Sequence, residues 1–378
     1  MSSFDERQAG VPFGSNDVRL SLHEWAVAAA IAGVVLCLAP RLWERVERFE
    51  PSPDARIPYS LGNDYWMYGR WSSMACAEGK VLVIGDSVVW GHYVRSDQTL
   101  SHHLGALAGG AQFANLGVDG IHPAALSGLI EQHGGAISDR EVILHLNLLW
   151  TSSERHDLQT TKEFSFNHPD LVPQFFPRIP CYRRSTSERL DVVIGRRLPF
   201  VAWAKHLRIA CFGGADLPSW TLEHPYADPL ARLTLELPSP DEPPSPAPIA
   251  KPWTEQGLAR FDAAWVELGT SIQWRFFQRA VEILQRRRNR VFVLVGPFNE
   301  HMLTPGSLEV YNLRKVQVEA WLKGREIPHF VPAALPSEQY ADASHPLSEG
   351  YAMLARQLFE NEAFRRFHGA KAGEEVSR

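Results

Sequence analysis

The feature that most constrains this 378-residue chain is a short apolar strand pattern whose copies are separated by helical segments. The first copy, VLVIG at 81–85, is rich in β-branched residues and ends in a glycine. Short buried strands that alternate with helices predict an α/β fold with a parallel sheet covered on both faces. In such sheets ligands bind beyond the carboxyl ends of the strands, so functional residues are expected just after each strand. The other expected strands are QFANLG (112–117), VILHLN (142–147), VFVLVG (291–296) and HFVPA (329–333), and the expected helices are about 97–108, 123–133, 257–288, 308–323 and 348–366.

One long segment, residues 151–253, interrupts this alternation. It ends in the proline-rich run LPSPDEPPSPAPIAKPW (237–253), which excludes a helix or a central strand and indicates an extended surface connection. The part before that run carries many large apolar side chains, among them Phe200, Trp203 and Trp220. Because that is too hydrophobic for a linker alone, we expect an inserted subdomain that packs like a lid beside the functional site.

A second organising feature is the uncharged run WAVAAAIAGVVLCLAP at 25–40. Sixteen helical residues span roughly 24 Å, slightly less than a hydrocarbon core of about 30 Å. Extension to Trp43 closes most of the gap if Arg41 snorkels, and it places Trp25 and Trp43 at the two interfaces. The sequence therefore predicts a tail over 1–24, a transmembrane anchor over 25–43, and a globular domain over 56–368 that contains the insertion.

Two other interpretations of this run are a buried core helix and a cleaved signal peptide. The signal peptide fits less well, because the preceding stretch is long and contains four acidic residues. Orientation is a separate question: two arginines precede the run, and arginines at 41, 45, 48 and 56 follow it. This bias weakly favours a cytoplasmic location for the globular domain.

Composition excludes several other classes of function. The net charge is −5, and the densest basic cluster, RRRNR at 286–290, fits the end of a helix, so no nucleic-acid partner is expected. The four cysteines form no CxxC pair and no zinc-ligand spacing with histidine, and the pair His102-His103 is expected on a helix surface. We expect no metal and no cofactor.

Two short motifs suggest nucleophilic chemistry. Gly85-Asp86-Ser87 follows the first strand directly, which places a serine near a helix start at the carboxyl edge of the sheet. Near the C-terminus, Asp342 precedes His345 by three residues on a turn. That spacing brings the carboxylate to Nδ1 of the histidine and leaves Nε2 free to take a proton from a serine.

Two more positions fall at strand ends. Gly117 follows QFANL, where a backbone N–H can approach a ligand closely, and Asn147 ends VILHLN, where its amide can donate to an oxyanion. Asn299 and His301 follow the strand at 291–296 and are candidate substrate contacts. We expect His92 and His145 to be packing histidines.

Serine, glycine, asparagine, then aspartate and histidine, each just past a strand, form a pattern that resembles the SGNH (GDSL-type) hydrolase family. The resemblance covers roughly 80–147 and 291–366, and it implies a three-layer flavodoxin-like fold and serine ester chemistry. It implies Ser87 as nucleophile, His345 as general base and Asp342 as its orienting partner. The Ser87 N–H, the Gly117 N–H and the Asn147 side chain are then the oxyanion hole.

The chain departs from the family pattern in two blocks. The first block reads GDSVVWG and lacks the usual leucine after the serine. The third reads His145-Leu146-Asn147-Leu148 where the family commonly has GxND, so the Gly and the Asp of that block are missing.

Three functions agree with this pattern. The first is a carboxylic-ester hydrolase that acts through an acyl-enzyme. The second is an O-acyl(acetyl)transferase or deacetylase on a cell-envelope or secreted polysaccharide, by analogy with membrane-anchored relatives, with Trp90, Trp150 and Trp253 available for sugar stacking. The third is a non-catalytic binding module. The expected partners are a small-molecule or carbohydrate ester and a membrane, and the analogy places the globular domain outside the cytoplasm, against the arginine distribution.

Overall fold

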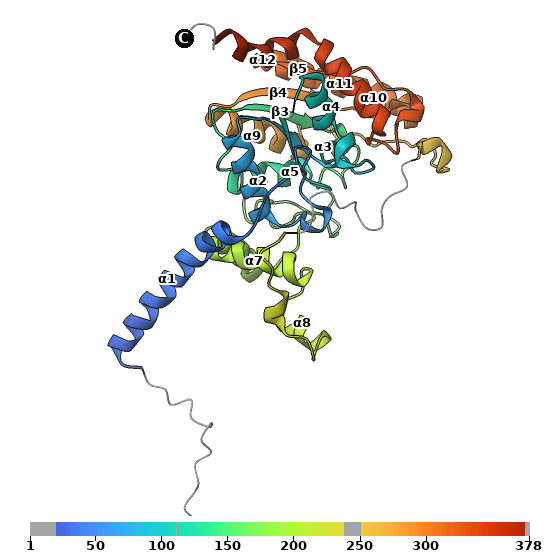
Figure 1. Ribbon diagram of the computed structural model, residues 1–378. Coiled ribbons are helices and arrows are strands. Elements are labelled where there is room, and N and C mark those ends of the chain that lie inside the picture. The colour runs from blue at the N-terminus through green and yellow to red at the C-terminus, as the bar shows by residue number, and fades with distance from the viewer. Residues whose placement is uncertain (1–19, 111, 238–250, 375–378) are drawn as a thin grey trace, which may run out of the picture. The chain divides into compact units, whose positions relative to one another are not determined.

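The computed structural model describes residues 20–110, 112–237 and 251–374, and the chain divides into two units, Met1–Val46 and Glu47–Arg378 (Figure 1). The described part of the first unit contains helix α1, Leu22–Val46. Ser21 and Glu24 form a capping box at its start, since Ser21 Oγ accepts from the Glu24 N–H and Glu24 Oε2 accepts from the Ser21 N–H. Helix α1 is long and apolar enough to cross a membrane, a property that signal sequences share. Most of the tail expected over 1–24 lies outside the described residues.

The second unit is built on a five-stranded sheet in which every paired strand is parallel to its neighbour. The strand order is β2-β1-β3-β4-β5. In the register, Gly85 lies opposite Gly117, so the carboxyl ends of β1 and β2 are level. The α/β class predicted from the alternating pattern is confirmed. The strands are β1 (Val81–Gly85), β2 (Phe113–Gly117), β3 (Glu141–Leu146), β4 (Arg290–Val295) and β5 (His329–Phe330).

Helices cover both faces of this sheet, because side chains along each strand alternate between two apolar cores. Leu82 and Ile84 of β1 belong to the larger core, with side chains of α2, α5, α9 and α10. Val81 and Val83 belong to the second core, with side chains of α3, α4, α11 and α12. The helices are α2 (Tyr65–Ala77), α3 (Ser87–Trp90), α4 (Leu100–Leu107), α5 (Pro123–Gln132), α9 (Ile272–Arg286), α10 (Pro305–Gly324), α11 (Ser348–Glu360) and α12 (Glu362–Glu374).

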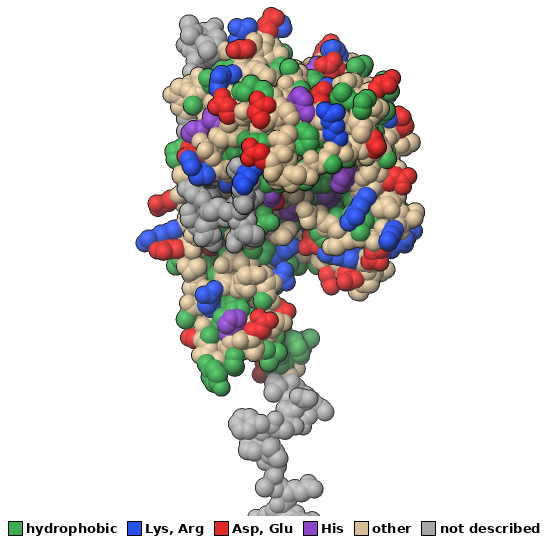
Figure 2. Space-filling view, turned by 90° about the vertical axis from the view of Figure 1, so that its right-hand side faces the viewer, with side chains coloured by type: hydrophobic (Ala, Val, Ile, Leu, Met, Phe, Trp, Pro, Cys, Tyr) green, Lys and Arg blue, Asp and Glu red, His purple; other side chains and the backbone are tan. Residues whose placement is uncertain are grey.

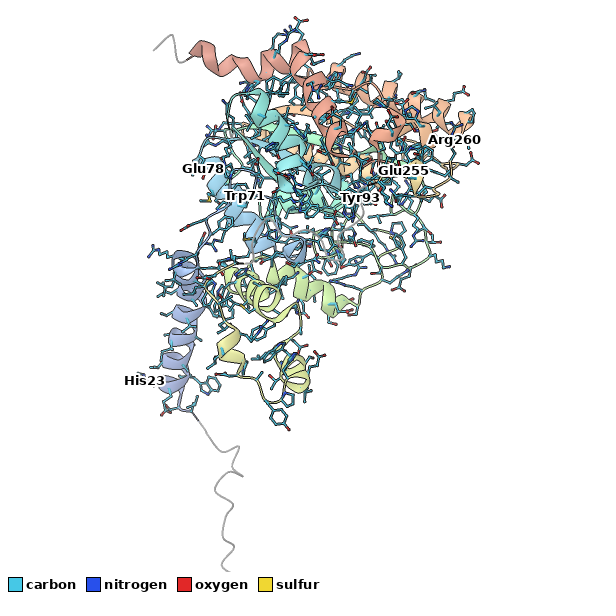
Figure 3. The ribbon with its side chains drawn as sticks, turned by 45° about the vertical axis from the view of Figure 1, so that its right-hand side comes forward. His23, Trp71, Glu78, Tyr93, Glu255 and Arg260 are labelled. Atoms are coloured by element: carbon cyan, nitrogen blue, oxygen red, sulfur yellow. The ribbon has the colours of Figure 1, made fainter. Side chains whose placement is uncertain are left out.

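Helix α2 was not anticipated within the polar, aromatic stretch that precedes β1. Its first turn is capped by Asp64, whose carboxylate accepts from the Met67 N–H at 3.1 Å. Trp71, labelled in Figure 3, is buried on the face of α2 turned to the sheet, and its indole N–H donates to the Asn115 carbonyl at 2.8 Å. The helix thus fastens the entry segment onto β2.

The insertion after β3 contains helices but no paired strand in its described part. It starts with the short 3₁₀ helix η3 (Leu148–Thr151), and a segment without regular elements leads to α6 (Thr186–Gly195), α7 (Pro199–Phe212) and α8 (Leu217–Glu223). Residues 238–250 of the expected proline-rich connection lie outside the described residues. The other short 3₁₀ helices are η1 (Tyr59–Leu61), η2 (Ser96–Gln98), η4 (Pro229–Arg232), η5 (Trp253–Glu255), η6 (Glu300–Met302) and η7 (Ser337–Gln339).

Two expected helices have different bounds in the structure. The helix expected over 257–288 begins only at Ile272, because the backbone before it pairs with other segments: the Phe261 N–H donates to the Met302 carbonyl at 2.8 Å. The helix expected over 348–366 is divided into α11 and α12. Asn361 lies at the break, and its side chain accepts from the Phe364 N–H at 3.0 Å, which starts a new helix.

Candidate active site

The turn from β1 to α3 presents Ser87 at the carboxyl edge of the sheet. Ser87 is the first residue of α3, and the preceding Asp86 caps this helix by accepting from the Val88 N–H at 3.0 Å. The tight turn requires Gly85, since a Cβ there would lie 2.5 Å from Val89 and 2.7 Å from His145. Ser87 itself is largely buried, with 9% of its surface exposed.

The loop before α11 brings His345 to this serine. His345 Nε2 lies 2.7 Å from Ser87 Oγ, although the two residues are 258 positions apart. On the other side of the ring, His345 Nδ1 lies 2.8 Å from each oxygen of Asp342. The Asp342 carboxylate also accepts from the backbone N–H groups of Ser344 and His345, at 2.9 and 3.0 Å, which holds the turn. The structure thus brings together the three residues that the sequence pattern singled out.

Electrostatics in this group suit proton transfer. Burial raises the pKa of Asp342, but the charge of His345 and its hydrogen bonds outweigh burial and hold that pKa at about 2. Burial lowers the pKa of His345, whereas the charge and hydrogen bond of Asp342 raise it, with Asp86 and Asp119 adding to the rise. The net pKa of His345 lies above its usual value. An imidazole held this way accepts a proton readily and is oriented by a carboxylate that stays ionised.

Asp86 organises the floor of the site. Its Oδ2 accepts from the Asn147 side-chain amide and from the Trp150 indole, each at 2.9 Å. Its Oδ1 accepts from the Val88 N–H, and His145 Nδ1 lies 3.2 Å from it. Burial raises the pKa of Asp86, but the charge and hydrogen bond of His145 and the bonds from Trp150 and Asn147 lower it to about 2. Asn147 therefore donates one amide hydrogen to Asp86 and has a second amide hydrogen still available.

Gly117 does not have the position expected of an oxyanion donor. Its N–H donates to the Asn115 side chain at 3.0 Å, and the amide has no second hydrogen. A Cβ at Gly117 would lie 2.3 Å from the Trp90 nitrogen, so the glycine is required because β2 and α3 pack in direct backbone contact. Gly120 follows in the next turn with φ of +71°, and its N–H donates to no group in the described part of the chain.

The two candidate substrate contacts after β4 also have other partners. Asn299 is fully buried, with 0% exposed, and its amide donates to the Asp342 carbonyl at 3.0 Å. It therefore braces the Asp342 turn. His301 is half-buried, and its Nε2 lies 3.0 Å from the Leu335 carbonyl. That bond ties η6 to the loop before η7.

Sequence reasoning missed a second imidazole–carboxylate pair beside the first. His92 Nδ1 lies 2.6 Å from Asp119 Oδ1, and the His92 ring centroid lies 5.4 Å from that of His345. Tyr93, labelled in Figure 3, packs edge-on against both rings. The available signal was the place of Asp119, two residues past the end of β2. Figure 2 shows histidine side chains gathered in a hollow that crosses one face of the molecule.

A pocket of about 440 Å³ adjoins the site on the insertion side. Trp150, which donates to Asp86, forms one wall, and Gly120, His122 and residues between 153 and 167 form the others. Its wall contains three aromatic side chains and Arg155, whose guanidinium lies 4.9 Å from the centre of the Phe164 ring. No Asp or Glu is among the described lining residues. Such a lining fits an uncharged or anionic group with an apolar face.

The described part of the chain contains no group of three or more His, Cys, Asp or Glu side chains arranged to hold a metal ion. The sequence matches no family model. It also has no significant match among curated proteins. Interpretation of the site therefore depends on its own geometry.

Proposed function

We propose that the chain is a serine-dependent carboxylic-ester hydrolase of the SGNH (GDSL-type) family. The observation that carries the proposal is the relay from Ser87 Oγ to His345 Nε2 at 2.7 Å and from His345 Nδ1 to Asp342 at 2.8 Å. Nucleophile, base and orienting acid in this geometry activate a serine. The strand order β2-β1-β3-β4-β5 supports the same assignment, since it is the order of flavodoxin-like sheets.

Acylation begins when Ser87 Oγ attacks the ester carbonyl carbon and its proton passes to His345 Nε2. The tetrahedral oxyanion is held by the Ser87 N–H and by the second amide hydrogen of Asn147. Gly120 replaces Gly117 as the candidate for the third donor, because the N–H of Gly117 is already bonded to Asn115. When this tetrahedral intermediate collapses, the bond between the carbonyl carbon and the alcohol oxygen breaks. The alcohol leaves with the proton from His345, and Ser87 remains acylated.

Deacylation repeats these steps with water as the nucleophile. His345 takes a proton from the water as its oxygen attacks the acyl carbon. When the second tetrahedral species collapses, Ser87 Oγ leaves and recovers the proton from His345, and the carboxylic acid departs. Each oxyanion donor is expected to contribute on the order of 3 kcal/mol to the barrier reduction.

The test is labelling of the intact chain with a fluorophosphonate probe, followed by mapping of the labelled peptide, with Ser87→Ala as the matched variant. Label on the peptide that contains Ser87, absent from the variant, together with p-nitrophenyl acetate hydrolysis that the variant loses, supports the proposal. A folded wild-type protein that neither takes up the probe nor hydrolyses the ester excludes it. The non-catalytic binding module would then be the better interpretation.

The second candidate function is acyl transfer to, or deacetylation of, a polysaccharide. The aromatic pocket of about 440 Å³ beside Trp150 favours it, because sugar rings stack on aromatic side chains. In transfer, a sugar hydroxyl replaces water in the second step and the product is a new ester. Acyl groups that appear on an added oligosaccharide in preference to water support transfer, and release of free acid alone supports hydrolysis.

Location is part of the proposal. Helix α1 would be a single-pass anchor, and the globular unit would lie outside the cytoplasm, where ester-bearing envelope polysaccharides occur. Protease protection of the chain in sealed membrane vesicles of known orientation tests the sidedness. The arginines that follow the apolar run favour the opposite orientation, so a cytoplasmic globular unit is the outcome that refutes this part.

A further inference from the structure

The insertion exposes large apolar side chains far more than the rest of the globular unit. We name residues 175–235, which include α6, α7 and α8, the insertion arm. The described part of the globular unit has 17 exposed large hydrophobic side chains, and 12 of them lie in the insertion arm. Leu222 on α8 is 83% exposed, and Phe176 is 91% exposed. Surface hydrophobics gathered in this way mark an interaction surface.

Packing within the protein does not account for the three helices of the arm. Helix α6 buries none of its side chains, α7 buries only His206 and Cys211, and α8 buries only Trp220. In Figure 1, α7 and α8 project from the side of the globular unit opposite α11 and α12. Because most helices gain their stability from a buried apolar face, helices with so little burial are expected to have another partner.

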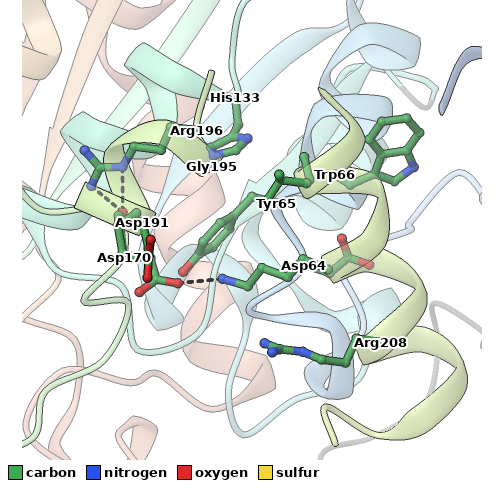
Figure 4. Close-up of a pocket in the computed structure, with 13 residues that line it drawn as sticks. Asp64, Tyr65, Trp66, His133, Asp170, Asp191, Gly195, Arg196 and Arg208 are labelled. Carbon is green, nitrogen blue, oxygen red and sulfur yellow. Dashed lines mark hydrogen bonds and ion pairs between the residues drawn. The ribbon is translucent and has the colours of Figure 1, made fainter. Parts of the chain in front are cut away.

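The arm is nevertheless firmly attached at its base. His206 of α7 is fully buried between two carboxylates, with Nδ1 2.6 Å from Asp64 and Nε2 2.7 Å from Glu47. A second attachment is the ion pair between Lys205 of α7 and Asp170, at 2.7 Å. Both residues line a pocket of about 330 Å³, and Asp170 is labelled in Figure 4. The exposed surface is therefore carried by a fixed element and not by a loose loop.

The position of Glu47 at the base of the arm points to the membrane as the partner. Glu47, which holds His206, is the residue that follows Val46, the last residue of α1, in the chain. The end of α1 is therefore one peptide bond from the residue that holds α7, and the expected anchor ends four residues before Glu47, at Trp43. Charge points the same way: the arm has nine Lys and Arg against five Asp and Glu, a net charge of +4 in a chain whose net charge is −5.

We infer that the insertion arm lies on the surface of the lipid bilayer that holds α1, with its apolar side chains in the headgroup region and its arginines against anionic lipids. Helices with an exposed apolar face and surrounding basic residues bind membrane interfaces in this way. The inference rests on the proposed membrane anchor and is independent of the ester chemistry. It gives the insertion a role in holding the globular unit against the membrane.

The test is nitroxide labelling of the full-length chain in nanodiscs of phosphatidylcholine with one-third phosphatidylglycerol. Cys76, Cys181 and Cys211 are buried, so exposed Cys37 in α1 is the site that takes up label in the native chain, and it reports on the anchor itself. In a Cys37→Ala background, Leu222→Cys reports on the arm. Leu313→Cys, 51% exposed on α10, is the matched control outside it.

Accessibility to oxygen, which concentrates in lipid, is compared with accessibility to a water-soluble nickel chelate. We expect at least a several-fold higher oxygen-to-nickel ratio at position 222 than at 313, and a fall in that difference when phosphatidylglycerol is omitted. Equal ratios at 222 and 313, with lipid exposure at 37, overturn the inference while the anchor stands. A label at 222 that is shielded from both reagents indicates a protein partner instead. Nickel access at 37 refutes the anchor and the inference together, and it leaves the esterase proposal untouched.

Discussion

Replacement of Asp86 by asparagine tests the organisation of the site floor. Oδ1 faces the Val88 N–H and His145 Nδ1, whereas Oδ2 faces the Asn147 amide and the Trp150 indole. An asparagine presents one oxygen and one NH₂ group, so either orientation of its amide sets an NH₂ against donors. In the better orientation the asparagine oxygen keeps the bonds from Asn147 and Trp150, and its NH₂ group faces the Val88 N–H and His145. His145 can change tautomer and accept from that NH₂, but the Val88 N–H can only donate and is left unpaired.

The magnitude follows from the ionisation of Asp86. Its pKa of about 2, against an ordinary value of 3.8, corresponds to roughly 2.5 kcal/mol of stability at neutral pH, since each pKa unit is about 1.4 kcal/mol. An unpaired buried N–H adds about 1–3 kcal/mol. We therefore expect Asp86→Asn to lower the free energy of unfolding by about 3.5–5.5 kcal/mol at pH 7. The lowered pKa means that the wild-type contribution is complete above about pH 4 and is lost as the pH falls through about 2.

The assay is urea unfolding of the full chain in detergent, followed by tryptophan fluorescence, at pH 7. The matched control is Asp97→Asn, which removes a half-exposed ion pair with Arg95 and is expected to change stability by less than about 1 kcal/mol. Equal effects of the two substitutions would show that the Asp86 contacts do not carry the energy assigned to them.

Three further predictions follow from other contacts. Asp342→Asn is expected to lower kcat by about 10³–10⁴-fold with folding intact. It should also move the acid limb of the kcat/KM profile to lower pH, because Asp342 raises the pKa of His345 above its usual 6.5 in the wild type. An unchanged pH profile contradicts the pairing of Asp342 with His345. Burial lowers the pKa of His206, but its two carboxylate partners raise it to about 9, so stability should be complete below about pH 6.5 and fall as the pH rises through 9. Urea midpoints at both pH values measure this, and His206→Gln should abolish the difference. Gly117→Ala is expected to reduce stability by about 1–3 kcal/mol, because its Cβ would overlap the Trp90 backbone, and a wild-type urea midpoint refutes that contact.

The sheet could be predicted from sequence because its strands are buried on both faces. Such strands read as continuous apolar runs, and four of the five have the expected position to within two residues at each end. The start of α9 could not be predicted the same way. Residues 257–271 have a composition that permits a helix, and only backbone bonds to distant segments, such as Phe261 to Met302, decide against one.

The Ser87, His345 and Asp342 group was within reach of sequence reasoning for a topological reason. The carboxyl ends of parallel strands meet at one edge, so polar residues just past separate strands converge whatever their distance in sequence. Gly117 and Asn299 obey the same rule and still have different roles. Whether an N–H at a strand end faces the crevice or a neighbouring side chain depends on one hydrogen bond, here to Asn115, that no local pattern specifies.

The His92 and Asp119 pair is an arrangement that sequence reasoning could not predict. Each residue alone is unremarkable in sequence, since His92 follows a short helix and Asp119 sits in a turn. The pair exists because backbone contact between α3 and β2, which Gly117 permits, sets the two following loops side by side. Gly117, which the sequence suggested as an oxyanion donor, therefore has a structural role: it allows α3 to pack closely on β2. That packing places both Ser87 and the loop that contains His92 at the site.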